Sequence, residues 1–300
     1  MNASAEVEAR LRADAWTLCR GIGERTIQHG LAEAERSIHQ ALDETGLPVE
    51  RQGYNWCGVR VANLVAHAGP ASGRPLVVGA HYDTVAGTQG ADDNASAVCV
   101  LLELARRLAQ EPPPIPVRLA AFTLEEGAAF GTPKQGSRVF VRRLRETGTH
   151  PRGAIVLEMV GYTDERQSYP GPLRYAGYPR TGDFLAIVGN LRSWCFMRTT
   201  ARAFRQERAL PVETLTVPLN GWPLPDIRRS DHVSFWDVGW PAVMATDTSF
   251  FRNPHYHTAD DRYETLDFAF MAKVAAGLEH AVRERGPVTA RTERHDRYAT

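Results

Sequence analysis

Gly79-Ala80-His81-Tyr82-Asp83-Thr84 and, a few residues later, Gly90-Ala91-Asp92-Asp93-Asn94-Ala95-Ser96 are the stretches that decide the fold of this chain. An apolar run at residues 75–79, rich in β-branched side chains, precedes the first stretch and predicts a strand buried on both faces. His81 and Asp83 follow directly after it. Ligands in open α/β sheets gather outside the carboxyl ends of the strands, so these polar side chains indicate a functional site.

The residue types in this position are those of a metal site. An imidazole is a good zinc ligand, and a carboxylate two residues later can bind its second ring nitrogen and fix the tautomer. A capped loop with a satisfied histidine is the plain alternative, because a zinc site needs several ligands. The choice between the two depends on whether other parts of the chain supply further ligands.

Composition and charge describe an ordinary globular protein. The 300 residues are 43% apolar, enough for one large α/β domain or two small ones. Lys plus Arg equals Asp plus Glu at 35 each, so nothing favours nucleic acid or an anionic membrane as a partner. Residues 1–10 lack the apolar core of a signal peptide and no later run is long enough to span a bilayer, so we expect a cytoplasmic protein.

The cysteines exclude a thiolate metal site. Cys19, Cys57, Cys99 and Cys195 are scattered without Cys-x-x-Cys spacing, which favours reduced core thiols over a disulfide framework. Any metal must therefore be bound by histidines and carboxylates.

Helical and strand patterns alternate along the chain. The expected helices cover residues 3–20, 30–45, 137–146, 192–208 and 267–285, with one more that runs from a cap at Asp93 or Asn94 to the prolines at 112–116. The expected strands cover residues 50–65, 75–79, 117–123, 154–158, 184–188, 213–217 and 241–246. Since no linker interrupts this alternation, it predicts a single α/β domain over residues 1–285, followed by a charged tail at 286–300. Residues 161–181, rich in Gly, Pro and Tyr, are expected to form a long loop beside the site.

Three successive core strands each end in a residue that can bind metal. His81 follows the first, Glu125 and Glu126 follow the second, and Glu158 ends the third. In an extended strand end, successive side chains point to opposite sides, so Glu125 and Glu126 cannot easily ligate the same ion. The collected candidates, with the histidine of a later polar loop, are His81, Asp92, Glu126, Glu158 and His257.

This ordered set resembles the co-catalytic two-zinc exopeptidases typified by bacterial leucyl aminopeptidase, whose relatives include glutamate carboxypeptidase and the glutaminyl cyclases. The motifs that carry the resemblance are His81-Tyr-Asp83, Asp92-Asp-Asn94, Glu125-Glu126, Glu158 and Tyr256-His257. It covers roughly residues 50 to 280. It implies a single three-layer α/β domain of the zinc-exopeptidase, phosphorylase/hydrolase-like type, in which helices flank a mixed, mostly parallel central sheet.

The resemblance also implies a role for each site residue. Asp92 would bridge two zinc ions, His81 and Glu158 would complete one, and Glu126 and His257 the other. Glu125 would be the general base, Asp83 would orient His81, and Tyr256 would hydrogen-bond the tetrahedral intermediate. Two zinc ions are favoured and one is possible, because the glutaminyl cyclases share most of these positions and use one. Glu158 stands where the best-known aminopeptidases of the family have Asp, one methylene shorter.

The function implied is that of a metallopeptidase, an aminopeptidase that hydrolyses N-terminal residues from a peptide or small amide. One alternative is a glutaminyl cyclase-like acyltransferase with one zinc. The other is a non-catalytic binding module of the same fold, which would have lost ligands. His255 could compete with His257, but the family pattern places the ligand after Tyr. His232 is either a residue behind the ligands or a satisfied loop histidine. The oligomeric state and the side-chain preference stay open.

Overall fold

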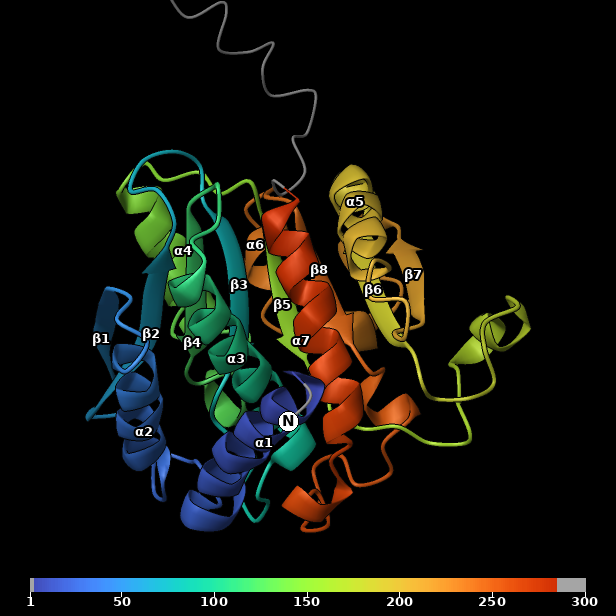
Figure 1. Cartoon of the computed structure of the whole chain (residues 1–300), viewed down its shortest axis with the longest axis horizontal. Coiled ribbons are helices and arrows are strands. Elements are labelled where there is room, and N and C mark those ends of the chain that lie inside the picture. Colours follow the sequence, from blue (N-terminus) through green and yellow to red (C-terminus); the bar gives the residue numbers. More distant parts are fainter. Residues whose placement is uncertain (1–2, 285–300) are drawn as a thin grey trace, which may run out of the picture.

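The computed structural model describes residues 3–284, and within this range eight strands form one sheet in the order β1-β2-β4-β3-β5-β8-β6-β7 (Figure 1). The pairs β3–β4, β3–β5, β5–β8 and β6–β7 are parallel, and the other three are antiparallel. The predicted mixed, mostly parallel sheet is thus confirmed. In chain order the strands are β1 (Val49–Trp56), β2 (Val59–Ala68), β3 (Leu76–His81), β4 (Val117–Phe122), β5 (Gly153–Glu158), β6 (Leu185–Asn190), β7 (Val212–Val217) and β8 (Ala242–Thr246).

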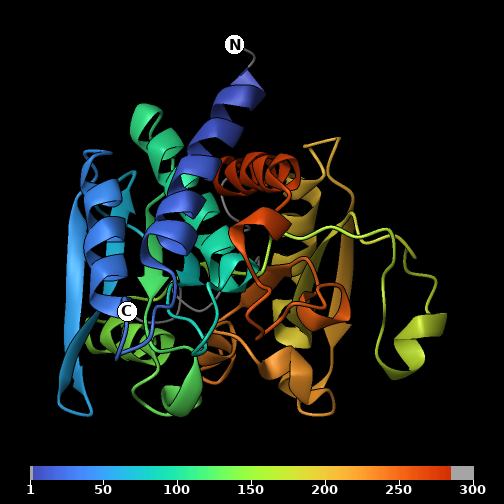
Figure 2. The ribbon, with the colours of Figure 1, turned by 90° about the horizontal axis from the view of Figure 1, so that it is seen from below.

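Helices cover both faces of the sheet. The larger hydrophobic cluster packs one face against α1 (Ala3–Trp16), α2 (Leu31–Asp43), α3 (Ala97–Gln110), α5 (Trp194–Phe204) and α7 (Phe268–Arg283). The smaller cluster packs the other face against α4 (Gly136–Glu146) and the short α6 (Val233–Trp236). Figures 1 and 2 show the resulting three layers. The chain is therefore the single α/β domain that the sequence predicts.

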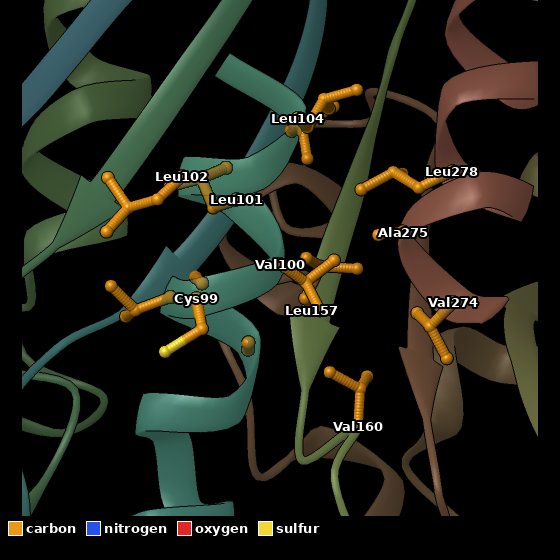
Figure 3. Close-up of a cluster of buried hydrophobic side chains, with 14 of the residues drawn as sticks. Cys99, Val100, Leu101, Leu102, Leu104, Leu157, Val160, Val274, Ala275 and Leu278 are labelled. Atoms are coloured by element: carbon orange, nitrogen blue, oxygen red, sulfur yellow. The ribbon is translucent and has the colours of Figure 1, made fainter. Parts of the chain in front are cut away.

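The centre of the larger cluster lies where α3 and α7 meet over β5. Val100 and Leu104 of α3, Leu157 of β5 and Val274 and Leu278 of α7 are all buried in it (Figure 3). Each buried side chain of this size contributes roughly 1.5–3 kcal/mol relative to an exposed one. This packing fixes α3 and, with it, the turn that precedes α3 at the carboxyl edge of the sheet.

That turn differs from its prediction. Asp93 and Asn94 were expected to cap the helix, but α3 begins at Ala97 and neither side chain caps it. Residues Ala91–Ser96 form a wide π-type turn in which Asp93 and Asn94 have non-helical backbone angles. A similar turn, Thr17–Ile22, follows α1. The sequence pattern did not distinguish a cap from a turn that carries ligands.

The remaining short elements lie in the loops. The long loop at residues 161–181 projects from the body of the molecule, at the right of Figure 2, and holds a 3₁₀ turn. The 3₁₀ turns are Gly127–Ala129, Gly171–Tyr175, Leu191–Ser193, Leu219–Gly221, Pro225–Arg228, Ser249–Phe251 and Tyr263–Thr265.

The cysteine prediction holds in part. Cys19 and Cys99 are buried in the core, whereas Cys57 and Cys195 are exposed, and all four are free thiols. Among residues 3–284, no helix has both the length and the apolar character needed to cross a membrane. The charged tail predicted at residues 286–300 lies outside the described residues.

Candidate metal centre

The predicted ligands come together at the carboxyl edge of the sheet. β3 ends at His81, β5 ends at Glu158, and Glu125 comes shortly after the end of β4. Because β4, β3 and β5 are parallel neighbours, their carboxyl ends lie side by side. The turn before α3 and the loop after residue 251 bring Asp93 and His257 to the same edge.

Two histidines contact the two carboxylate oxygens of one aspartate, Asp93. His81 Nε2 lies 3.4 Å from Asp93 Oδ1, and His257 Nε2 lies 3.1 Å from Asp93 Oδ2. Each histidine also meets a glutamate: Glu158 Oε1 is 3.5 Å from His81 Nε2, and Glu126 Oε1 is 3.0 Å from His257 Nε2. Asp93 therefore stands between two matching pairs, each made of one histidine and one glutamate.

The structure does not bring Asp92 into this cluster, so the expectation that Asp92 bridges two ions does not fit the geometry. The Asp92 carboxylate accepts hydrogen bonds from Gly161 N at 2.9 Å and Asn253 Nδ2 at 2.8 Å. The physical reason is that the irregular backbone of the turn sends the two adjacent side chains in different directions. Asp93, the next residue of the same motif, takes the central place.

Asp83 holds the backbone that carries the two adjacent glutamates. Its carboxylate accepts the backbone N–H groups of Glu125 at 3.1 Å and Glu126 at 2.8 Å. The Nδ1 atom of His81 lies 3.2 Å from the Asp83 carbonyl oxygen and 3.7 Å from its carboxylate. Glu126 contacts His257, whereas Glu125 Oε2 is 4.0 Å from His81 Nε2. The two glutamates thus face different parts of the cluster, as their adjacent positions predict.

Of the other predicted residues, Tyr256 lies beside the cluster and two histidines do not. The Tyr256 ring stacks on the His257 ring, with centroids 3.7 Å apart. His255 instead sets its ring edge against Tyr162. His232 is buried against Trp236, and burial lowers its pKa to about 3.

Ser230 and Asp261, to which the sequence assigned no role, hold the cluster in place together with Asn94, which was expected only as a helix cap and as part of the Asp92-Asp-Asn94 motif. Ser230 Oγ donates to Glu158 Oε2 at 2.6 Å. The Asp261 carboxylate accepts the backbone N–H groups of Asp92 at 2.8 Å and Asp93 at 3.1 Å. The Asn94 side chain bonds the main chain on both sides of Glu158, through Leu157 O and Met159 N. Ser230 and Asp261 are polar and lie in loops or turns, so no spacing in the sequence identifies them.

The cluster has more negative charge than its own histidines balance. Burial and the neighbouring Asp93 raise the pKa of Glu126 to about 7, and burial with nearby carboxylates raises that of Glu125 well above its usual range. Burial would lower the pKa of His257, but its hydrogen bonds to Asp93 and Glu126 raise it to about 9. Such a buried, acidic group of ligands is a place where cations are stabilised.

The spacing of the ligand atoms fits zinc. Two ligands of one tetrahedral zinc ion, at bond lengths of about 2.0–2.2 Å, stand roughly 3.2–3.6 Å apart. The pairs of His81 Nε2 with Asp93 and Glu158, at 3.4 and 3.5 Å, match this value, and the pairs of His257 are slightly shorter. His81 Nε2 and Asp93 Oδ1 are also buried atoms without a hydrogen-bond partner among the described residues. Imidazole and carboxylate donors are the set that zinc binds without thiolates.

Two pockets open from the two sides of this cluster. The first lies beside Glu158 and is largely apolar, with Phe184, Leu215 and Met244 in its wall. Tyr169 and Tyr178 of the long loop also line it, so that loop borders the site as expected. The second, wider pocket runs past Glu125, Glu126 and His257 toward Trp56 and Phe130. The cluster is therefore accessible to an extended molecule with an apolar side chain.

Comparisons with known proteins identify the family. The model of peptidase family M28 matches residues 63–282. Protein YfbL of Escherichia coli, described as uncharacterized, is 37% identical over 252 residues, which cover 80% of this chain and 76% of YfbL. The chain belongs to peptidase family M28, a family of metallopeptidases, and the predicted family is confirmed.

More distant similarities agree with this membership. Leucine aminopeptidase 1 of Emericella nidulans is 25% identical over 254 residues, which cover 80% of this chain. The chain spans only 57% of the length of that aminopeptidase. The solved structure of BSAP, a zinc aminopeptidase from Bacillus subtilis, superimposes with a TM-score of 0.71 at 16% identity and covers 95% of this chain and 96% of BSAP. At that identity the likeness concerns the fold alone.

Proposed function

We propose that this chain is a zinc-dependent aminopeptidase that hydrolyses N-terminal residues from peptides. The observation that carries the proposal is the symmetry around Asp93, whose two carboxylate oxygens lie 3.4 and 3.1 Å from the two histidines. A carboxylate in this position can bind two ions at once, as two-metal hydrolases require. If only one pair of a histidine and a glutamate lay beside Asp93, the site would support only one zinc ion.

The ligands divide into two sets around Asp93. His81 and Glu158 would hold one zinc ion, and His257 and Glu126 the other. Ser230 supports Glu158, because its hydroxyl donates to the oxygen that does not face His81. Asp83 positions both glutamates of the second strand end through their backbone N–H groups. This assignment keeps Glu125 free of metal.

Glu125 is the general base in this proposal. Bound zinc ions would polarise the scissile carbonyl and lower the pKa of a water molecule. Glu125 would take a proton from that water and pass it to the leaving amine, which is the task of a carboxylate that ligates nothing. Glu125 is buried and its Oε2 lies 4.0 Å from His81 Nε2, so its carboxylate is within the cluster and next to a proposed zinc ligand. Tyr256, stacked on His257, would donate its hydroxyl to the tetrahedral intermediate.

The apolar pocket beside Glu158 would take the side chain of the N-terminal residue. Its aromatic and aliphatic walls favour a large apolar side chain, which gains roughly 1.5–3 kcal/mol on full burial. The rest of the bound peptide would extend into the wider pocket. The test is zinc analysis of the purified protein together with a panel of amino-acid anilides and of leucyl and glutaminyl peptides.

We expect up to two zinc ions per chain, release of free leucine from leucyl peptides and loss of activity to chelators. Release of ammonia with a cyclised product from glutaminyl peptides would instead assign the acyltransferase. An active preparation without a transition metal would contradict the proposal, and zinc-loaded protein without activity on any substrate of the panel would favour a binding module.

A further inference from the structure

The two pockets meet at a pair of side chains. Arg229 and Tyr256 are in the walls of both the apolar pocket and the wider pocket. Arg229 directly precedes Ser230, whose hydroxyl is bonded to Glu158, so its backbone is fixed beside a proposed ligand. The Arg229 guanidinium lies 5.9 Å from the centroid of the Tyr256 ring, and that ring stacks on His257. A cation thus stands next to the cluster where a substrate would pass from one pocket to the other.

Among the described residues, the guanidinium of Arg229 is much less engaged than those of comparable arginines. The neighbouring Arg228 donates to Asn220 O at 2.7 Å and Asp237 Oδ1 at 2.8 Å. Arg25, the other arginine in these pocket walls, is fully buried and donates to main-chain carbonyls, among them Tyr82 O and Gly90 O. Arg229 has only an exposed contact of 4.0 Å with Asp226, a kind of pair that contributes little.

The surroundings of Arg229 keep it ready for a ligand. Its guanidinium lies over the rings of Phe250, at 5.6 Å, and Tyr256, and its side chain is 49% exposed. Such cation–π contacts do not use the N–H donors of a guanidinium, which stay free for a ligand. A guanidinium has five N–H donors in a planar fork. This fork matches the two oxygens of a carboxylate better than it matches a neutral group. Apart from Arg25, which is fully buried, and His257, a proposed zinc ligand, the other charged side chains that line the two pockets are acidic, Glu125, Glu126 and Glu158 among them.

We propose that Arg229 binds the free α-carboxylate of the residue that leaves on hydrolysis, so that the preferred substrates are dipeptides. This inference rests on the proposed peptidase function and adds its substrate class. In a dipeptide the carboxylate carbon lies two bonds, about 2.5 Å, beyond the leaving nitrogen. A cation that recognises it must therefore lie close to the metal ligands, as Arg229 does. In longer peptides the same position holds a neutral amide, which cannot form the paired contact.

The experiment compares leucyl-leucine, leucyl-leucinamide and a leucyl tripeptide as substrates of the zinc-loaded protein. We expect kcat/KM for the free dipeptide to exceed that for its amide by roughly 10–100-fold, the range of a charge-assisted bond. Arg229→Gln should bring this ratio close to one, and Arg229→Lys, a point charge, should give an intermediate ratio. The matched control is Arg198→Gln, since Arg198 is also exposed and stacked on an aromatic ring, Trp194, but lines neither pocket. Its ratio should equal that of the wild type.

The possible results distinguish a failure of this inference from a failure of the proposed aminopeptidase function. Equal rates on the dipeptide and its amide, or an Arg229→Gln variant that keeps the wild-type ratio, would overturn the carboxylate site and leave the aminopeptidase intact. Cleavage of N-acetyl-leucine that depends on Arg229 would support the carboxylate site and contradict the aminopeptidase, because that substrate has no free amine. Zinc content and melting temperature, measured for each variant, should match the wild type, which shows that the ratio reports recognition and not folding. If the zinc-loaded protein cleaves none of these compounds, both proposals are wrong.

Discussion

Two groups of buried carboxylates in this molecule are balanced in different ways. On the helical face, Glu103 of α3 is bonded to Arg10 at 2.7 Å and to Arg107 at 2.9 Å. At the carboxyl edge of the sheet, the ion-pair partners of Glu126 and Asp93 within residues 3–284 are histidines. Glu103 and Asp93 are buried and Glu126 is only slightly exposed, and an unpaired carboxylate is costly in such places. The two groups differ in the source of the positive charge that balances their carboxylates.

The pKa values record that difference. Burial would raise the pKa of Glu103, but the hydrogen bonds from Arg10 and Arg107 lower it. Burial also raises the pKa of Glu126, and there the result is about 7, because Asp93 adds to it and the histidines offset only part. On the helical face arginines are bonded to the carboxylate, whereas among the described residues no arginine or lysine is bonded to Glu126 or Asp93. We infer that the missing charge at the sheet edge is supplied by metal ions.

The largest effect is expected from the proposed base. Glu125→Gln keeps the size of the side chain and every proposed ligand, so kcat should fall by roughly 10²–10⁴ while the zinc content stays near that of the wild type. Glu126→Gln should lower the zinc content instead. Atomic absorption and kcat for both variants test the pair of roles. Zinc loss in Glu125→Gln with an intact Glu126→Gln would reverse the two roles.

A smaller effect, of another kind, is expected on the helical face. Glu103→Gln leaves Arg10 and Arg107 without their carboxylate and should lower the free energy of unfolding by about 1–3 kcal/mol, measured in urea. Zinc content and kcat should not change, because this face is separate from the metal centre. A variant that loses zinc as well would show that the two carboxylate groups are coupled.

The smallest expected effect is the change with pH in the stability of the zinc-free protein. In the zinc-free protein the pKa of Glu126 is raised to about 7 and that of His257 to about 9. Both values are higher than in the unfolded chain, so their contribution to stability is present below the unfolded values, about 4.3 and 6.5, and is lost as pH rises through 7 and 9. Glu103 has the opposite sign, and its contribution is lost only in acid.

The zinc-free protein should therefore melt at a lower temperature at about pH 9 than at about pH 6, and the stabilisation by added zinc should grow over the same interval. Thermal melts with zinc and with chelator check this, and Glu126→Gln should weaken the pH dependence. A zinc-free melting temperature that rises between these two pH values would contradict the pKa values given for the cluster.

Much of this picture can be predicted from the sequence, because strands and helices leave periodic patterns and ligands follow strand ends. His81, Glu126 and Glu158 were found in this way and His257 through the Tyr256-His257 motif of the resemblance, and the structure brings the four together. The choice of Asp92 as the bridge does not fit the structure, since two adjacent aspartates have the same chemistry and only the backbone of the turn separates their directions. The helical pattern of α3 places Arg107 one turn after Glu103, but it gave no sign of the second partner, Arg10, which lies in a distant helix.

The sequence also could not predict the position of Arg229, because only the tertiary fold brings its contacts together. It lies in a loop, and its contacts with Phe250 and Tyr256 are made across a gap in the sequence that no local pattern covers. Asp261 and Ser230 also act on the cluster only through the tertiary fold. What the sequence predicts is therefore the set of ligands, and what it leaves open is which neighbour of each motif faces the metal.

The zinc stoichiometry of Asp93→Asn, measured beside that of Asp92→Asn, tests the central claim most directly. Both substitutions keep the size of the side chain and remove one charge from the same turn. If the carboxylate of Asp93 joins two ions, Asp93→Asn should lose most of its zinc, while Asp92→Asn, bonded to Gly161 and Asn253, should keep zinc close to the wild-type content. Full zinc in Asp93→Asn together with zinc loss in Asp92→Asn would contradict the account and return the bridging role to Asp92.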